Sequence, residues 1–168
     1  MKTKMSVIKR FLTVCLTATL VFAIALPVGA ASGHSCKYKS VTARPGESAS
    51  RLKKKVGAKR KSNPSCAASG YGYVYNGKDI KLETYTKVKR SNATEYINSI
   101  TFKTKKPQTD KGVKIGSTLS KVKKAYSKAD NNKEIKSGRT NTFTKGKVVL
   151  KITIKKNKVT GIKYLLAN

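Results

Sequence analysis

A chain of 168 residues with 38 Lys and Arg against 7 Asp and Glu has a formal net charge of +31. Such a surface repels copies of itself and attracts polyanions. Hydrophobic residues make up 38% of the chain, which fits a folded domain rather than a disordered one. One histidine and seven carboxylates leave little material for acid–base catalysis.

Residues 1–30 read as a secretory signal peptide. An apolar run over residues 11–28 ends in the small-x-small pattern Val28-Gly29-Ala30, so cleavage is expected after Ala30 or Ala31. An uncleaved anchor is the alternative, because about 18 apolar residues can just span a bilayer. Cys15 lacks the preceding small residue that a lipid-attachment site needs. We expect a secreted, extracellular or cell-surface protein. Its net charge is +27 once four basic residues are removed with the signal: Lys2, Lys4, Lys9 and Arg10.

Two cysteines, Cys36 and Cys66, remain after signal removal. In an oxidising compartment an even count predicts one disulfide between them. It would close a loop of about 30 residues and contribute about 3–4 kcal/mol by restricting the unfolded chain. The alternatives are two free thiols, or a metal pair with His34. Two cysteines and one histidine fall short of a structural zinc site, so no metal is expected.

Two segments seventy positions apart, residues 45–57 and 115–127, share glycine, hydroxyl, aliphatic and lysine positions in register. Each is followed by β-like sequence that closes with a similar strand, at residues 96–102 and 158–164. The repetition predicts one duplicated unit of a helix followed by about three strands.

The predicted fold class is therefore α+β. It consists of two tandem units, each a short helical segment packed on a roughly three- to four-stranded antiparallel sheet. Residues 31–106 form the first unit with an N-terminal tail, and residues 112–168 form the second. Residues 107–111 form a connector, because this stretch contains Pro107 and has no apolar periodicity.

Helix signals mark the start of each unit. Ser48 and Thr118 stand where an N-cap hydroxyl belongs, and Gly57 suits a left-handed stop for the first helix. Apolar residues recur on one helical face of each segment, so Leu52 and Val122 are expected to occupy matching buried positions under a sheet.

Hairpin signals follow each helix. Asn76-Gly77 suits a type I′ turn that pairs Tyr75 with Lys78, and Lys145-Gly146 is the expected turn of the second unit. The pairing sends alternate residues to opposite faces. Toward the helices we expect Tyr71, Tyr73, Ile80, Leu82, Val148, Leu150, Ile152 and Ile154.

Residues 112–118 with 122–126, and residues 64–70 leading into Tyr73-Val74-Tyr75, carry a resemblance to a known family. The chain resembles secreted and lipid-anchored proteins of Gram-positive bacteria whose duplicated helix-plus-sheet unit is similar to β-lactamase inhibitory protein. The unit also resembles the small lipoprotein of the outer-membrane assembly machine. The resemblance covers roughly residues 40–168 and implies binding of proteins through an exposed sheet face. No individual binding residue is carried over from it.

No catalytic constellation is visible in the sequence. His34, the only histidine, lies in the predicted tail, and no phosphate-cradling glycine loop, HExxH or CxxC spacing is present. The carboxylates are scattered among turns and lysine-rich segments, where turn formation or surface countercharge is the expected role. They are Glu47, Asp79, Glu83, Glu95, Asp110, Asp130 and Glu134. We expect a protein that is not an enzyme and has no cofactor.

Two surfaces are candidates for binding. The helix lysines are expected to bind an anionic cell-wall polymer or membrane surface; ordinary solvation is the alternative, and nucleic acid is less favoured. These residues are Lys53, Lys54, Lys55, Lys121, Lys123 and Lys124. The sheet face turned away from the helices suits an extracellular protein partner, which would be gripped by an inhibitor or adaptor. Its predicted binding residues are Lys81, Tyr85, Lys151 and Lys163, accompanied by Val74, Ile97, Val149 and Val159. The leading hypothesis is a basic binding module associated with the anionic cell envelope.

Overall fold

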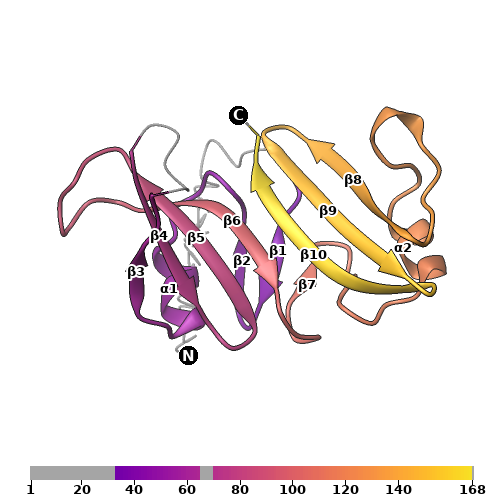
Figure 1. The fold of residues 1–168 in the computed structure, drawn as a ribbon, viewed down its shortest axis with the longest axis horizontal. Helices are drawn as coiled ribbons and strands as arrows, with labels where there is room; N and C mark the ends of the chain where they lie inside the picture. The colour runs from indigo at the N-terminus through magenta and orange to yellow at the C-terminus, as the bar shows by residue number, and fades with distance from the viewer. Residues whose placement is uncertain (1–32, 65–69, 168) are drawn as a thin grey trace, which may run out of the picture. The chain divides into compact units, whose positions relative to one another are not determined.

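The protein is mostly β-strand in the computed structural model, which describes residues 33–64 and 70–167 (Figure 1). The predicted signal peptide and Cys66 lie outside the described residues. The described elements are β1 (Cys36–Tyr38), β2 (Val41–Ala43), α1 (Ser50–Val56), β3 (Arg60–Ser62), β4 (Tyr71–Asn76), β5 (Ile80–Thr86), β6 (Tyr96–Phe102), β7 (Gln108–Thr109), α2 (Leu119–Ala125), a 3-10 turn η2 (Asp130–Asn132), β8 (Arg139–Lys145), β9 (Val148–Lys155) and β10 (Lys158–Leu166).

Seven strands form one antiparallel sheet in the order β3-β4-β5-β6-β10-β9-β8. The two halves of the sheet meet where β6 pairs with β10, with Thr101 opposite Lys163 and Ile100 opposite Tyr164. The prediction of two tandem α+β units, each with a helix on its own sheet, is therefore wrong. An unpaired strand edge leaves N–H and C=O groups without partners, and β6 and β10 satisfy each other's groups by joining.

One face of this sheet is covered by the two helices and by a three-stranded sheet, β2-β1-β7, which lie behind the large sheet in Figure 1. Helix α1 contacts β2, β4 and β5. The Tyr164 hydroxyl of β10 donates to the Ser35 carbonyl, 2.8 Å away, just before β1. No described element crosses the opposite face, which we call the open face.

The strands before and after the β6·β10 junction bury the residues that alternation predicts. Val148, Leu150, Ile152 and Ile154 of β9 are at most 1% exposed, as expected for one face of a strand packed on a core. On the other side of the junction, Ile80 and Leu82 of β5 are fully buried.

The helices are short, and their ends follow the sequence signals in part. Thr118 caps α2, its hydroxyl accepting from the Lys121 amide at 3.2 Å, as predicted. Gly57 ends α1 with φ 64°, also as predicted, but Ala49 rather than Ser48 is the N-cap of α1. Among the described residues no helix is long and apolar enough to cross a membrane.

The first hairpin has the predicted faces but a different register. Tyr75 pairs with Leu82 instead of Lys78, and Asn76 is the last residue of β4. The loop is therefore longer than two residues, and the prediction of a two-residue type I′ turn is wrong. Lys103 holds this loop with hydrogen bonds to Asn76 and to the Gly77 carbonyl. The register moves by an even number of residues, so the side chains keep their expected faces, but Tyr71, predicted to point toward the helix, is 42% exposed.

Two β-bulges reverse the expected face of two residues. Ile97 and Val159 were predicted for the open face, yet both are buried, at 0% and 1% exposed. The pairing shifts register between Ile97 and Ser99 in β6 and between Val159 and Gly161 in β10. One extra residue in a strand swaps the faces of all residues beyond it, and here it directs both side chains into the core.

The predicted tail and connector are part of the fold. The tail forms β1 and β2, and the connector contains β7, which pairs with β1 at Cys36–Thr109. His34 is 7% exposed and packs edge-on against Tyr126, with ring centroids 5.7 Å apart. Burial holds the pKa of His34 below its usual value. These segments contribute to the core although they show no strand periodicity of their own.

The buried positions of Leu52 and Val122, 1% and 0% exposed, generate a stability prediction. Leu52→Ala and Val122→Ala should each lower the free energy of unfolding by about 2–4 kcal/mol through lost burial and a cavity. Urea titration of the protein measures this. Val88→Ala is the control, because Val88 is 50% exposed and should change stability by no more than about 0.5 kcal/mol. Unchanged unfolding midpoints for both core variants would contradict this packing.

Candidate anion-binding surface

Cross-strand register places three lysines in one line on the open face. Lys81 of β5 is opposite Thr101 of β6, which is opposite Lys163 of β10. Lys163 is opposite Lys151 of β9, which is opposite Thr142 of β8. We call Lys81, Lys163 and Lys151 the lysine row. Because neighbouring strands lie about 4.8 Å apart, the Cα atoms of the row span roughly 15 Å.

A second line of residues lies beside the lysine row on the same face, two residues away along each strand. Glu83 and Ser99 lie opposite each other, followed by Leu165 and Val149. Lys81 Nζ is 2.6 Å from a Glu83 carboxylate oxygen, and the Ser99 hydroxyl donates to the other oxygen at 2.6 Å. Burial alone would raise the pKa of Glu83, but these two hydrogen bonds lower it. The one carboxylate among these strands is therefore charged and already engaged.

A tyrosine pair lies at the far end of the open face. Tyr85 is opposite Gly72 on one side and Tyr96 on the other, and the two rings are 5.7 Å apart. Glycine provides no side chain to cover Tyr85 from β4. Tyr85 therefore shares the open face with the lysine row, as predicted, but lies four residues along β5 from Lys81.

Glu95 forms a buried ionic network that the sequence did not predict. It is 5% exposed and accepts hydrogen bonds from Lys53 at 2.8 Å, Tyr75 at 2.8 Å and Thr84 at 2.6 Å, with Arg60 at 3.5 Å. Burial alone would raise the pKa of Glu95, but these partners lower it. The expectation that Glu95 is a surface countercharge is wrong, because folding places it under α1 with a complete set of donors.

Asp79 is also buried rather than a surface countercharge. It is 4% exposed and accepts from Tyr38 at 2.8 Å and from Thr104 at 2.9 Å, with Lys106 3.7 Å away. The hydrogen bond from Tyr38 lowers the pKa of Asp79. Burial and this bond raise the pKa of Tyr38 to about 12.

The helix lysines predicted to bind polyanions lie on the other layer of the protein, away from the lysine row. Lys53 is bound to Glu95, and Lys123 pairs with Glu134 at 3.1 Å. The remaining four are exposed on the two helices: Lys54, Lys55, Lys121 and Lys124. The helix lysines therefore do not converge on one site.

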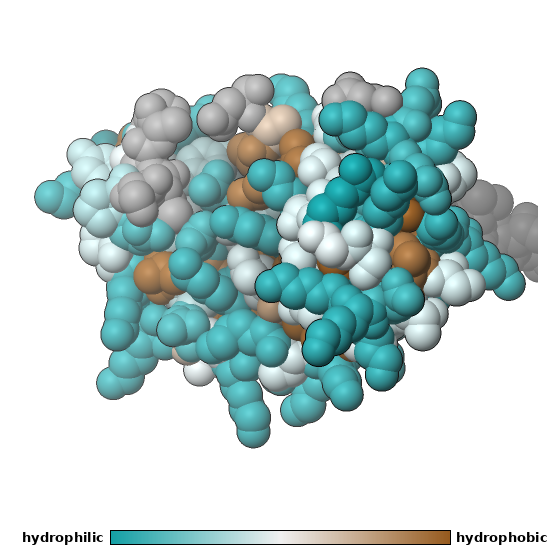
Figure 2. Space-filling model, turned by 45° about the vertical axis from the view of Figure 1, so that its right-hand side comes forward, coloured by the Kyte–Doolittle hydropathy of each residue, from teal (hydrophilic) through white to brown (hydrophobic). Residues whose placement is uncertain are grey.

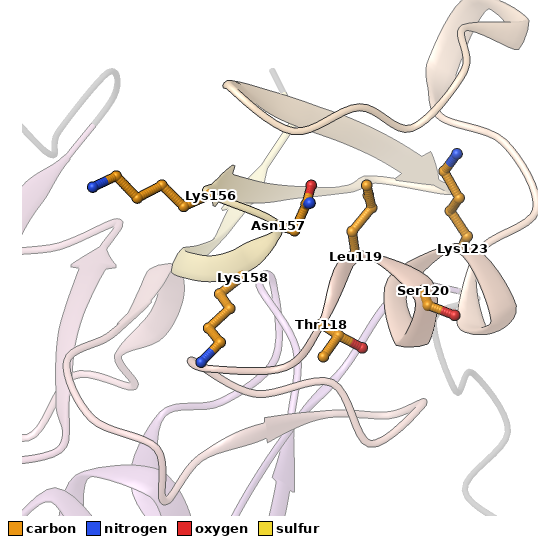
Figure 3. A pocket seen from close by; sticks show the side chains of 7 residues that line it. All are labelled: Thr118, Leu119, Ser120, Lys123, Lys156, Asn157 and Lys158. Atoms are coloured by element: carbon orange, nitrogen blue, oxygen red, sulfur yellow. The ribbon is translucent and has the colours of Figure 1, made fainter.

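A surface pocket lies where α2 begins beside the β9–β10 turn (Figure 3). It is lined by Thr118, Leu119, Ser120, Lys123, Lys156, Asn157 and Lys158. The ammonium groups of Lys123, Lys156 and Lys158 point in different directions in Figure 3. They do not form a convergent site for one compact anion.

Hydrophilic side chains dominate the surface seen in Figure 2, and the hydrophobic areas between them are small. This view contains no broad apolar patch of the kind that stable protein interfaces bury.

Cys36 is fully buried, and burial raises the pKa of its thiol to about 12. Its predicted partner, Cys66, is outside the described part of the chain, so the disulfide stays a prediction. Within residues 33–64 and 70–167, no three His, Cys, Asp or Glu side chains are grouped so that they could hold a metal ion.

Comparisons of the chain with protein-family models, curated proteins and solved structures found no match. The family resemblance in the sequence therefore stays a prediction, and function has to be argued from the surface itself.

The Glu95 network generates a second stability prediction. Glu95→Gln should lower the free energy of unfolding by about 1–3 kcal/mol, because it removes a charged acceptor shared by several donors. Glu134→Gln is the matched control: Glu134 is 61% exposed, so solvent screens its ion pairs and the substitution should change stability much less. Denaturant titration at pH 7 compares them. Equal effects of the two substitutions would show that burial of the network adds nothing to the free energy of unfolding.

Proposed function

We propose that the protein is an exported, non-catalytic binding protein that attaches to anionic phosphate polymers of the cell envelope. Export is inferred from residues 1–30, and attachment from the charge of the folded surface. Of 168 residues only seven are acidic, and the proposal depends on where the fold puts them.

The observation that carries the proposal is the internal use of carboxylates. Asp79 and Glu95 are buried, and Glu83 is bound to Lys81 and Ser99. They pair with Lys53, Arg60, Lys81 and Lys106, a small part of the Lys and Arg side chains, so most of the positive charge is left without a carboxylate partner. Lysines stay exposed or half-exposed on α1, α2 and the open face, and a predominantly positive surface attracts a polyanion from any direction.

A protein partner is the second candidate, and a specific observation favours it. The Tyr85–Tyr96 pair shares the open face with lysines and with the half-buried Leu165 and Val149. Aromatic side chains beside charged ones are typical of binding hot spots. Such an interface would lose most of its affinity in Tyr85→Ala and would depend little on salt.

The test of the proposal is binding of residues 31–168 to poly(glycerol phosphate) coupled to a resin, measured over a salt series. Each phosphate contact releases counterions, so log affinity should fall linearly with log salt, by about 0.7 per contact. Bacterial cell walls should retain the protein and lose it after their phosphate polymers are removed chemically.

Two results would contradict the proposal. One is retention that does not change with salt. The other is equal retention on intact and phosphate-stripped walls. Tyr85→Ala serves as a control. It should leave binding to the polymer nearly unchanged, whereas it should remove most of the affinity if the ligand is a protein.

A further inference from the structure

We infer that the lysine row is the track on which the phosphate polymer lies, with the polymer chain running across the strands of the open face. This inference rests on the proposed function and adds the place and direction of binding. The observations that carry it are the register of the sheet, the opposition of two lysines, and the side chains around them.

Register holds the three lysines at defined separations. Lys163 and Lys151 are directly opposite each other on β10 and β9, and Lys81 is two strands from Lys163. The corresponding Cα separations are about 5 and 10 Å. The row is too long for one compact anion and suits an extended chain with repeated phosphates. The helix lysines have no such common line.

The opposition of Lys163 and Lys151 is unfavourable without a ligand. Like charges directly opposite on neighbouring strands destabilise a sheet. Glu83, the only acidic residue in the seven strands, is bound to Lys81, and Lys163 also helps to lower its pKa, so Glu83 relieves this repulsion only in part. An anion placed between the two ammonium groups would offset their repulsion, so bound phosphate gains more here than at isolated lysines.

On one side of the row the side chains are short and polar, whereas Glu83, Leu165 and Val149 lie on the other side. Thr101 and Thr142 belong to the same line as the three lysines. Thr153 of β9 and Thr140 of β8 lie opposite each other two residues away from this line, with their hydroxyls 2.8 Å apart. Hydroxyls can donate to phosphate oxygens and leave room above the sheet. The lysine side chains therefore rise from a floor that an extended polyanion can approach.

The experiment compares two double variants with the same loss of charge. Lys151→Gln with Lys163→Gln removes two members of the row, and Lys54→Gln with Lys55→Gln removes two exposed lysines of α1. Affinity for poly(glycerol phosphate) is measured over a salt series. The row variant should bind roughly tenfold more weakly and lose about 1.4 from the salt slope, whereas the α1 variant should bind no more than about threefold more weakly.

Thermal unfolding gives an independent readout. The row variant should be at least as stable as the natural protein, because it removes a like-charge pair. A lower melting temperature would contradict that part of the argument. Poly(glycerol phosphate) should raise the melting temperature of the natural protein and of the α1 variant more than that of the row variant.

The outcomes separate the track from the proposed function. Equal losses in the two variants would overturn the track and leave polymer binding by total charge intact. No loss in either variant would overturn both. Binding to anionic phospholipid vesicles with no binding to the polymer would also overturn the track, because its length is matched to an extended chain.

Discussion

The pairing of β6 with β10 joins strands from the two parts of the chain into a single sheet, and the other features of the surface depend on it. Lys81 belongs to β5, whereas Lys163 and Lys151 belong to β10 and β9. They form one row only because Thr101 of β6 pairs with Lys163 of β10. If the two edges were apart, each would offer unpaired backbone groups and neither half would present a continuous face.

Charge is divided between the interior and the surface in an unusual way. Two of the carboxylates serve the fold: Glu95, directly before β6, binds Lys53 of α1, and Asp79 in the β4–β5 loop binds Tyr38 of β1. Lysine in turn supplies most of the solvent-facing charge. A strongly basic protein can therefore contain well-paired ions inside and still display a predominantly positive surface, which is the property that polyanion binding requires.

Local patterns in the sequence predicted local structure well. The buried faces of the helices at Leu52 and Val122, the Thr118 cap and the alternation of β9 were all evident, because each depends on residues a few positions apart. The same alternation predicted that Lys81 and Lys151 lie on the open face. The threonines of β8 show the same alternation, since Thr140, Thr142 and Thr144 lie on one face.

Features that depend on distant residues were not predictable in this way. Nothing in β6 or β10 alone shows that they pair, since either could equally be an edge strand. The bulges that bury Ile97 and Val159 add one residue and break the alternation on which the prediction relied. The three-residue strands β1, β2 and β3 are too short to show a period. Glu95 looked like any surface carboxylate, because its donors come from α1, β3, β4 and β5.

The junction of β6 with β10 is tested most directly by nuclear Overhauser contacts in isotopically labelled protein, residues 31–168. A single sheet predicts backbone proton contacts across the pairs Thr101–Lys163, Ile100–Tyr164 and Ser99–Leu165, and slow amide exchange along both strands. Absence of these contacts, with amides of β6 and β10 exchanging as fast as those of the edge strands β3 and β8, would contradict a single sheet and the lysine row with it.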